Sequence, residues 1–182
     1  MVDTRRTLSA LQALLADNTT GDISPQDIRD MLLTLAVPYG GVAMAGNATA
    51  TTISAANTDY VSNWNASGSE TNSREFTVST GGRLTYTGTP TNHFHVVAQC
   101  SAFVTVAASK LIAFSVVKNA TTVLPGQLTF NTQGSSDVTP LAVHADVMLA
   151  TNDYIELWVA NETDTSDVTV RDAYVFAMGM IE

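Results

Sequence analysis

The sequence predicts a mainly β protein: an antiparallel β-sandwich that follows a short N-terminal segment of two helices. Three observations lead to this fold class. Apolar residues recur with helical spacing over residues 1–36. From about residue 59 the period falls to two, as in strands with one buried face. Turn-forming residues then separate seven or eight strand-like segments, a spacing typical of sandwiches and barrels.

The first predicted helix begins near Thr7, which can cap the free amides of the first turn. Leu8, Leu11, Leu14 and Leu15 follow at helical spacing and form one apolar face. The turn-forming residues 17–21 (DNTTG) predict the end of this helix.

The second predicted helix carries a stronger start signal. Ser24 can cap it, Pro25 suits the first helical position, and Asp27 favours the positive end of the helix dipole. Two helices this short cannot form a core alone, so their apolar faces must pack on each other or on a partner. We therefore predict a docking segment, whose apolar residues are Leu11, Leu14, Leu15, Ile28, Met31, Leu32 and Leu35.

The rest of the chain divides into a connector and a β domain. Residues 37–58 are rich in Gly, Ala, Thr and Asn and predict an extended linker with at most one short strand. Residues 59–182 form the β domain. Its clearest predicted strands cover 76–78, 84–86, 93–106, 111–117, 138–149, 154–160 and 168–180, with a tight hairpin turn at 118–121.

Composition narrows the possible partners. Charged residues make up only 14% of the 182 residues, well below the roughly 25% usual for soluble domains, which favours subunits that cover one another. The net charge of −9 opposes binding to nucleic acid. The single cysteine, Cys100, excludes an internal disulfide and lies in an apolar run, as a small buried residue would.

The sequence lacks the signals of membrane insertion and export. No segment reaches the ~18–20 continuous apolar residues of a membrane span, and the N-terminus lacks the pattern of a signal peptide. We therefore expect a protein made in the cytoplasm, with no membrane insertion.

Two predicted strands are apolar on both faces, 111–117 and 173–181. A strand of a monomeric sandwich should alternate, because its outer face meets water. Self-association about a cyclic axis would cover the outer faces; a covering loop or one of the N-terminal helices is the alternative. The predicted subunit interface consists of Phe114, Val116, Tyr174, Phe176 and Met178.

Three segments, taken in order, resemble a known family. They are 82–88 (GRLTYTG), the hairpin 118–122 (KNATT) and 149–161 (LATNDYIELWVAN). This order is similar to the jelly-roll domains related to C1q and tumour necrosis factor that occur in phage surface proteins. Ala120 and Asn152 stand where that family usually has glycine. Residues 14–30 are similar to a segment that opens many phage virion proteins.

The resemblance implies a homotrimer with apolar strands along its axis, located on the virion. The first hypothesis is a capsid decoration (cement) or head-fibre protein that docks on the major capsid protein or another virion protein. The alternative is a short tail fibre that recognises a host surface glycan or protein, with Trp64 as a possible ligand contact in a polar loop. Packing of Trp64 at a sandwich edge or subunit interface is the interpretation that the sequence favours for this ring. Trp158, in an apolar strand, is predicted to lie in the core. A depolymerase is a third, weaker alternative.

The sequence predicts no catalytic residue, no metal site and no cofactor. His93 and His95 share one face of a strand, as do His144 and Asp146, but zinc needs three or four converging ligands. The spacing of Asp153 and Glu156 is not that of an EF-hand calcium loop, so it gives no support to a calcium site there. The remaining paired carboxylates, Asp164 and Asp167, lie in a turn-rich loop, where we expect them to stabilise turns and favour solubility.

Overall fold

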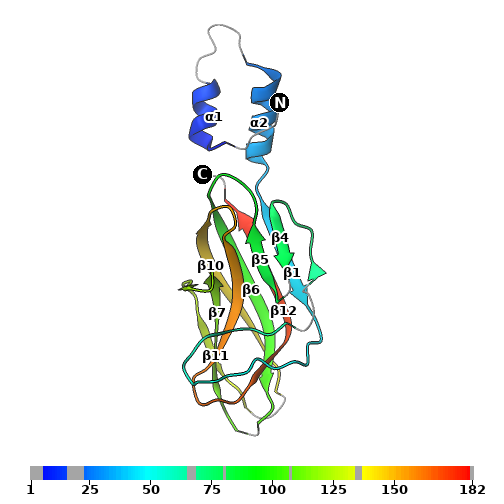
Figure 1. The fold of residues 1–182 in the computed structure, drawn as a ribbon, viewed down its shortest axis with the longest axis vertical. Coiled ribbons are helices and arrows are strands. Elements are labelled where there is room, and N and C mark those ends of the chain that lie inside the picture. Colours follow the sequence, from blue (N-terminus) through cyan, green and yellow to red (C-terminus); the bar gives the residue numbers. More distant parts are fainter. Residues whose placement is uncertain are drawn as a thin grey trace.

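The computed structural model describes residues 6–15, 23–64, 69–79, 81–106, 108–133 and 137–180. An elongated β-sandwich carries a pair of helices, the foot, at one end (Figure 1). Neither of the helices described in the foot is long and apolar enough to cross a lipid bilayer. The predicted turn at 17–21 lies outside the described residues.

The two helices begin where the sequence predicted. They are α1 (Leu8–Leu15) and α2 (Pro25–Leu35). At α1 the Ala10 amide donates to Thr7 Oγ1 at 3.2 Å, which confirms the predicted cap. At α2 the Asp27 amide donates to Ser24 Oγ, and the Ser24 amide donates to the Asp27 carboxylate. This reciprocal capping box holds the first turn of α2 without help from the sandwich.

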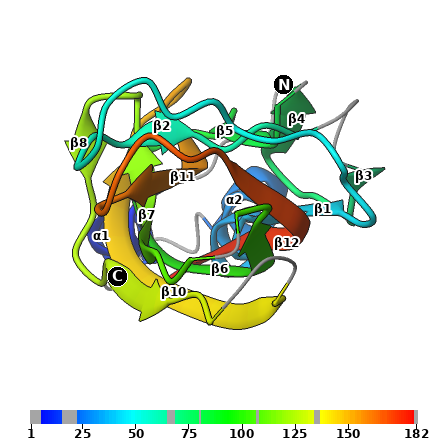
Figure 2. The same cartoon turned by 90° about the horizontal axis from the view of Figure 1, so that it is seen from below.

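In the part of the chain that the structure describes, twelve strands form two antiparallel sheets. Sheet A has, in spatial order, β10 (Thr139–Leu149), β6 (Asn92–Val104), β12 (Val168–Gly179), β1 (Tyr39–Met44) and β3 (Ser69–Glu70). Sheet B has β4 (Phe76–Ser79), β5 (Arg83–Tyr86), β11 (Tyr154–Asn161), β7 (Leu111–Lys118) and β8 (Thr122–Val123), with β2 (Tyr60–Val61) beside β11 and β9 (Leu128–Asn131) beside β7. Viewed along the long axis, the sheets face each other across the core (Figure 2). The predicted mainly β, two-sheet class is therefore confirmed.

The seven clearest predicted strands correspond to β4, β5, β6, β7, β10, β11 and β12. The connector predicted at 37–58, for which the sequence allowed one short strand, contains such a strand. Its residues 39–44 form β1, which pairs along its whole length with β12 inside sheet A. This part of the connector therefore belongs to the sandwich.

The core lies between the sheets and is anchored by three aromatic rings. Phe76, Tyr86 and Phe94 pack with centroid distances of 4.9–5.3 Å, and Phe94 meets both other rings edge to face. Leu84 and Ile155 are fully buried beside them in the same cluster. From β5 onward the chain passes repeatedly from one sheet to the other, so successive long strands contribute to opposite walls of this core.

The hairpin between β7 and β8 turns through two residues with left-handed backbone. Asn119 has φ 53° and Ala120 has φ 54°, and the Thr121 amide donates to the Lys118 carbonyl at 3.1 Å. Two positive φ values are the signature of a type I′ turn. Asparagine tolerates this conformation, whereas alanine is strained in it.

Replacing Ala120 by glycine should therefore stabilise the protein by about 0.5–1 kcal/mol. Ala120 is exposed, so no packing is lost. The expected result is a higher urea midpoint with an unchanged slope. Asn119→Gly is the matched control: it relieves the same backbone but removes hydrogen bonds to Asp153 and the Tyr154 amide, so it should not stabilise. An unchanged or lower midpoint for Ala120→Gly would contradict the strain argument.

Candidate functional site

Within the described residues, an apolar groove lies between the two helices of the foot, and an ion pair joins α2 to the residue before α1. Leu11 of α1 is only 3% exposed, and Met31 of α2 is half-buried beside the same groove. These two predicted docking residues therefore serve mainly to join the helices. The side chains of Leu14 and Leu15, which share the prediction, lie outside what the structure describes.

The ion pair fixes the foot at its base. The Asp30 side chain is 1% exposed and accepts hydrogen bonds from Arg6 Nε at 2.8 Å and Gln26 Nε2 at 2.6 Å. The Arg6 amide also donates to Thr34 Oγ1 at 2.9 Å. A buried carboxylate with two side-chain donors constrains the chain before α1 against α2.

A second apolar surface of α2 is only partly covered by the described chain. Ile28, Leu32 and Leu35 are 41%, 60% and 47% exposed and recur at i, i+4 and i+7, so they form one stripe, here called the α2 stripe. The stripe is distinct from the face that holds Asp30 and Thr34 against Arg6. Three of the seven predicted docking residues are therefore available to a partner.

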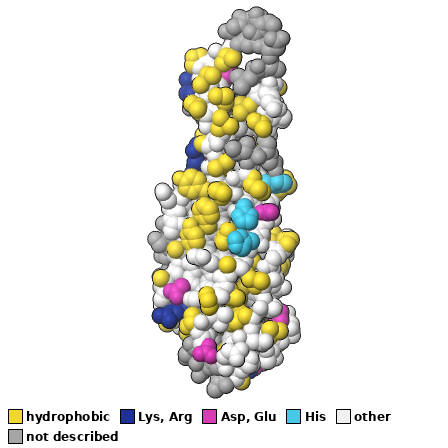
Figure 3. Space-filling view, turned by 180° about the vertical axis from the view of Figure 1, so that it is seen from behind, with side chains coloured by type: hydrophobic (Ala, Val, Ile, Leu, Met, Phe, Trp, Pro, Cys, Tyr) yellow, Lys and Arg dark blue, Asp and Glu magenta, His cyan; other side chains and the backbone are white. Residues whose placement is uncertain are grey.

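A second exposed surface is the outer face of sheet A. Along β12, Tyr174, Phe176 and Met178 point outward while the residues between them are buried. The Tyr174 and Phe176 rings are stacked at a centroid distance of 6.0 Å, and Met178 is 47% exposed. Figure 3 shows this face, with hydrophobic side chains gathered next to the three histidines. These three predicted interface residues are accessible on the single chain.

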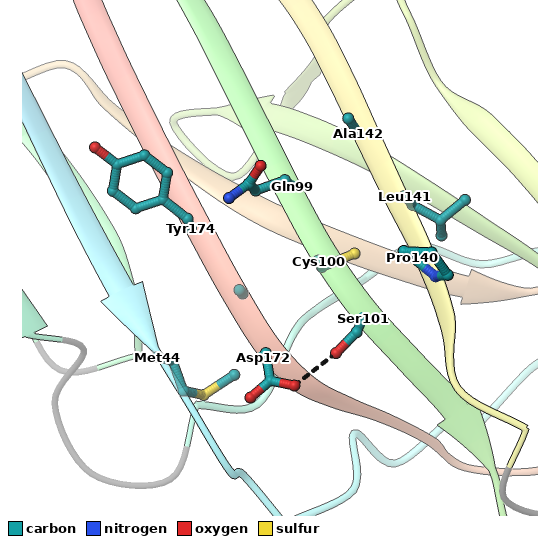
Figure 4. A pocket seen from close by; sticks show the side chains of 10 residues that line it. Met44, Gln99, Cys100, Ser101, Pro140, Leu141, Ala142, Asp172 and Tyr174 are labelled. Atoms are coloured by element: carbon teal, nitrogen blue, oxygen red, sulfur yellow. Dashed lines mark hydrogen bonds between the residues drawn. The ribbon is translucent and has the colours of Figure 1, made fainter.

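An open groove of about 670 Å³ crosses the same face (Figure 4). Tyr174 on β12 and Pro140 on β10 lie on opposite sides of it, and β6 runs between them. Asp172 accepts from the Gly46 amide and from Ser101 Oγ, so its carboxylate is engaged within the chain. The groove is therefore a depression in a largely apolar face.

Phe114 and Val116 do not belong to an interface. Their side chains are 0% and 1% exposed and point into the core of the single chain. The alternate β7 residues Ala113 and Val117 are also buried, at 0% and 1%. The structure therefore corrects the prediction for this strand: its second face is covered by the chain itself and needs no sister subunit.

The structure decides between the two interpretations of Trp64 and corrects the one for Trp158. Trp64 is 4% exposed, and its Nε1 donates to Ser62 Oγ at 2.8 Å, so the ring packs inside the sandwich and the hypothesis of an exposed ligand contact is wrong. A Cβ added at Gly82 would lie 2.3 Å from the Trp64 indole, so the glycine makes room for the ring. Trp158, predicted as core, is half-buried, and its Nε1 donates to the Glu156 carboxylate.

The histidines meet across strands, in a combination that the sequence did not suggest. His95 Nδ1 lies 2.7 Å from Asp146 Oδ1, and His95 Nε2 lies 3.3 Å from His144 Nδ1. The β6–β10 register places His95 opposite Asp146 and so brings these residues together. Over the described residues, no group of three or more His, Cys, Asp or Glu side chains is arranged to hold a metal ion.

The other candidate carboxylates have structural partners. Asp153 pairs with Lys118 Nζ, and Glu156 with Arg83 Nε. A hydrogen bond from Lys110 lowers the pKa of Asp164 to about 2, with a further contribution from the Ser166 amide. These contacts show that the three carboxylates form ion pairs within the chain.

Cys100 is buried as expected, at 7% exposure. Burial raises the pKa of its thiol to about 12, so the reactive thiolate is scarce at neutral pH.

Comparison with models of protein families and with curated proteins gave no match for this chain. Its function must therefore be inferred from the two exposed surfaces, the α2 stripe and the outer face of sheet A.

Proposed function

We propose that this protein is a structural component of a bacteriophage particle, a homotrimeric capsid decoration or head-fibre protein that docks through its helical foot. The observation that carries the proposal is the α2 stripe. Three large apolar side chains stay partly exposed on a helix that is tied to Arg6 through the buried Asp30 carboxylate. Exposed apolar surface on a rigid element is typical of a protein contact site.

The position of the foot supports docking. It projects from one end of the sandwich (Figure 1), and the chain joins α2 to β1 through only 36–38. A partner that binds the stripe would therefore orient the whole sandwich outward. Three copies that act together would raise avidity without any new kind of contact.

The sandwich is, in this proposal, a jelly roll of the C1q and tumour necrosis factor type. The repeated passage of the chain between sheets from β5 to β12 supports it, because jelly rolls wrap two sheets in this way. The outer face of sheet A, with Tyr174, Phe176 and Met178, is then the subunit contact. Phe114 and Val116 are not part of it.

The tail-fibre alternative receives less support. Its proposed ligand contact, Trp64, is buried in the core and cannot stack on a glycan. The outer-face groove beside Tyr174 would be covered in the trimer proposed here. Docking of the foot is therefore the function to test first.

The test uses particles of a phage whose genome encodes this chain, prepared so that the protein is missing from them. The Leu32→Asp variant is added to these particles, and the amount that attaches is measured. A carboxylate in the middle of the α2 stripe cannot be buried against an apolar partner without a large cost, so attachment should be abolished. Cryo-electron microscopy and gel quantification of washed particles measure the bound protein. The variant should still sediment at three times the 19.2 kDa of one chain.

Ser9→Asp is the matched control, because it adds the same charge to an exposed position of the other helix of the foot, α1. A carboxylate in the first turn of α1 also suits the helix dipole. This variant should attach as the unmodified protein does. Normal attachment of Leu32→Asp would refute docking through the foot. Sedimentation of the unmodified protein as a single chain at micromolar concentration would refute the trimer.

A further inference from the structure

The chain's three histidines all lie on the outer face of sheet A, next to its apolar side chains (Figure 3). His95 belongs to β6 and His144 to β10, on adjacent rows of the sheet. Their rings are 5.5 Å apart at 38°, and the two nearest nitrogens, His95 Nε2 and His144 Nδ1, are 3.3 Å apart. The two ring nitrogens therefore lie close enough together to share one ligand.

Asp146 completes the arrangement from the other side of His95. Its Oδ1 lies 2.7 Å from His95 Nδ1, so it accepts the proton carried by that nitrogen. This tautomer leaves a lone pair on His95 Nε2, the nitrogen that faces His144. A carboxylate behind a histidine is the usual outer support of a metal-binding imidazole, because it fixes the ring and increases its basicity.

We propose that His95 and His144 form a two-imidazole site for a divalent transition metal of the zinc class, with Asp146 as the supporting carboxylate. Zinc–nitrogen bonds of ~2.0–2.1 Å at a tetrahedral angle place two nitrogens about 3.3–3.4 Å apart. The observed separation of 3.3 Å meets this requirement with no movement of the strands. Both ligands belong to one chain, but the pair lies beside the proposed subunit contact, because His95 is opposite Met178 in the β6–β12 register. Sedimentation of the same samples therefore accompanies the metal titration and separates a failure of metal binding from a failure of the proposed trimer.

Metal binding requires one proton to change position. In a pair of neutral imidazoles with this His95 tautomer, His144 Nδ1–H donates to His95 Nε2 when no metal is bound. With metal bound, both nitrogens present lone pairs to the cation, and the His144 proton resides on Nε2. For the neutral pair this step moves one proton and releases none.

The chain supplies only two ligands, since the described residues bring no third metal-binding side chain to the pair. Water fills the remaining positions, which gives a modest affinity. Imidazole ligands favour zinc, nickel and copper over magnesium, and copper should bind more tightly than zinc. Side-chain exposures of 42% for His95 and 70% for Asp146 leave the site accessible in a single chain.

The experiment is calorimetric titration of the untagged protein with zinc chloride, at about one pH unit above the ordinary imidazole pKa of ~6.5. A single zinc ion per chain should bind. His144→Gln and His95→Gln should each weaken binding at least 10-fold, and Asp146→Asn about 10-fold. Magnesium chloride should give no binding. Imidazole nitrogen chemical shifts should report the change of His144 tautomer on addition of zinc.

His93→Gln is the matched control, because it removes the third histidine of the same face and leaves the pair intact. It should bind zinc as the unmodified protein does. Equal affinity in the unmodified protein and the His95→Gln/His144→Gln double variant would overturn the site. An equal loss in His93→Gln, or a His144 tautomer that zinc does not change, would also overturn it.

Discussion

Replacing Trp64 by alanine is expected to destabilise the protein by about 3–5 kcal/mol, because it removes a large ring from the core. The indole is 4% exposed and packs where Gly82 leaves room for it. Its loss would leave a cavity at one end of the core. It would also deprive Ser62 Oγ, which donates to the Leu157 carbonyl, of the hydrogen bond that it accepts from Trp64.

Urea unfolding monitored by circular dichroism measures this loss. Trp158→Ala is the control, because its ring is half-buried and its polar contact is with Glu156, so its cost should be clearly smaller. Gly82→Ala should resemble Trp64→Ala in direction, since an added Cβ would strike the indole and Gly82 has φ 75°. A loss below that of Trp158→Ala would mean that Trp64 is not a core residue.

Replacing Arg6 by alanine should loosen the foot and leave the sandwich intact. It removes the Arg6 guanidinium from the buried Asp30 carboxylate, and breaking a buried ion pair by removing one partner costs about 3 kcal/mol. Amide hydrogen exchange in α2 should therefore accelerate about 100-fold, while exchange in β6 and β12 stays unchanged. Because the α2 stripe depends on this helix, attachment to particles should weaken as well.

Two further variants separate the effect of losing the Arg6 charge from the effect of losing side-chain volume. Arg29→Ala removes an exposed arginine of the same helix and should leave exchange almost unchanged. Arg6→Met combined with Asp30→Leu replaces the pair by apolar groups and should restore most of the protection, because such replacements of buried pairs are often neutral. Slow exchange in Arg6→Ala alone would show that the pair does not hold the foot.

The helix starts and the longer strands could be predicted because each has a strong local signal. Ser24, Pro25 and Asp27 form a capping pattern that needs no tertiary contact. β6 and β10 alternate buried and exposed residues over much of their length, so their period is unambiguous. Local chemistry and burial agree in these elements.

β1 was harder to predict because its small residues are required by neighbours that are distant in sequence. Gly40 and Gly41 resemble a chain break, yet a Cβ at Gly40 would lie 2.5 Å from Phe76, and one at Gly41 would lie 2.5 Å from Thr71. The strand needs glycine in order to approach these side chains. Nothing within 37–58 reveals that requirement.

The features of the candidate site also divide into those that local sequence predicts and those that depend on distant contacts. The α2 stripe could be predicted from helical periodicity, whereas the burial of Trp64 could not, because its immediate neighbours are polar while its ring turns inward. The His95–His144 contact depends on the pairing register of β6 with β10. A register shifted by one residue would place the partners on opposite faces, so the sequence alone could not bring them together.

The single cysteine makes the chain convenient to label. With a thiol pKa of about 12 and 7% exposure, Cys100 should react with maleimides far more slowly than an ordinary exposed thiol. A cysteine introduced at an exposed position, such as Gln12 in the foot or Gln127 between β8 and β9, would then carry a dye or cross-linker at one chosen point. Energy transfer between labelled chains could follow assembly in solution without further mutation of the natural thiol.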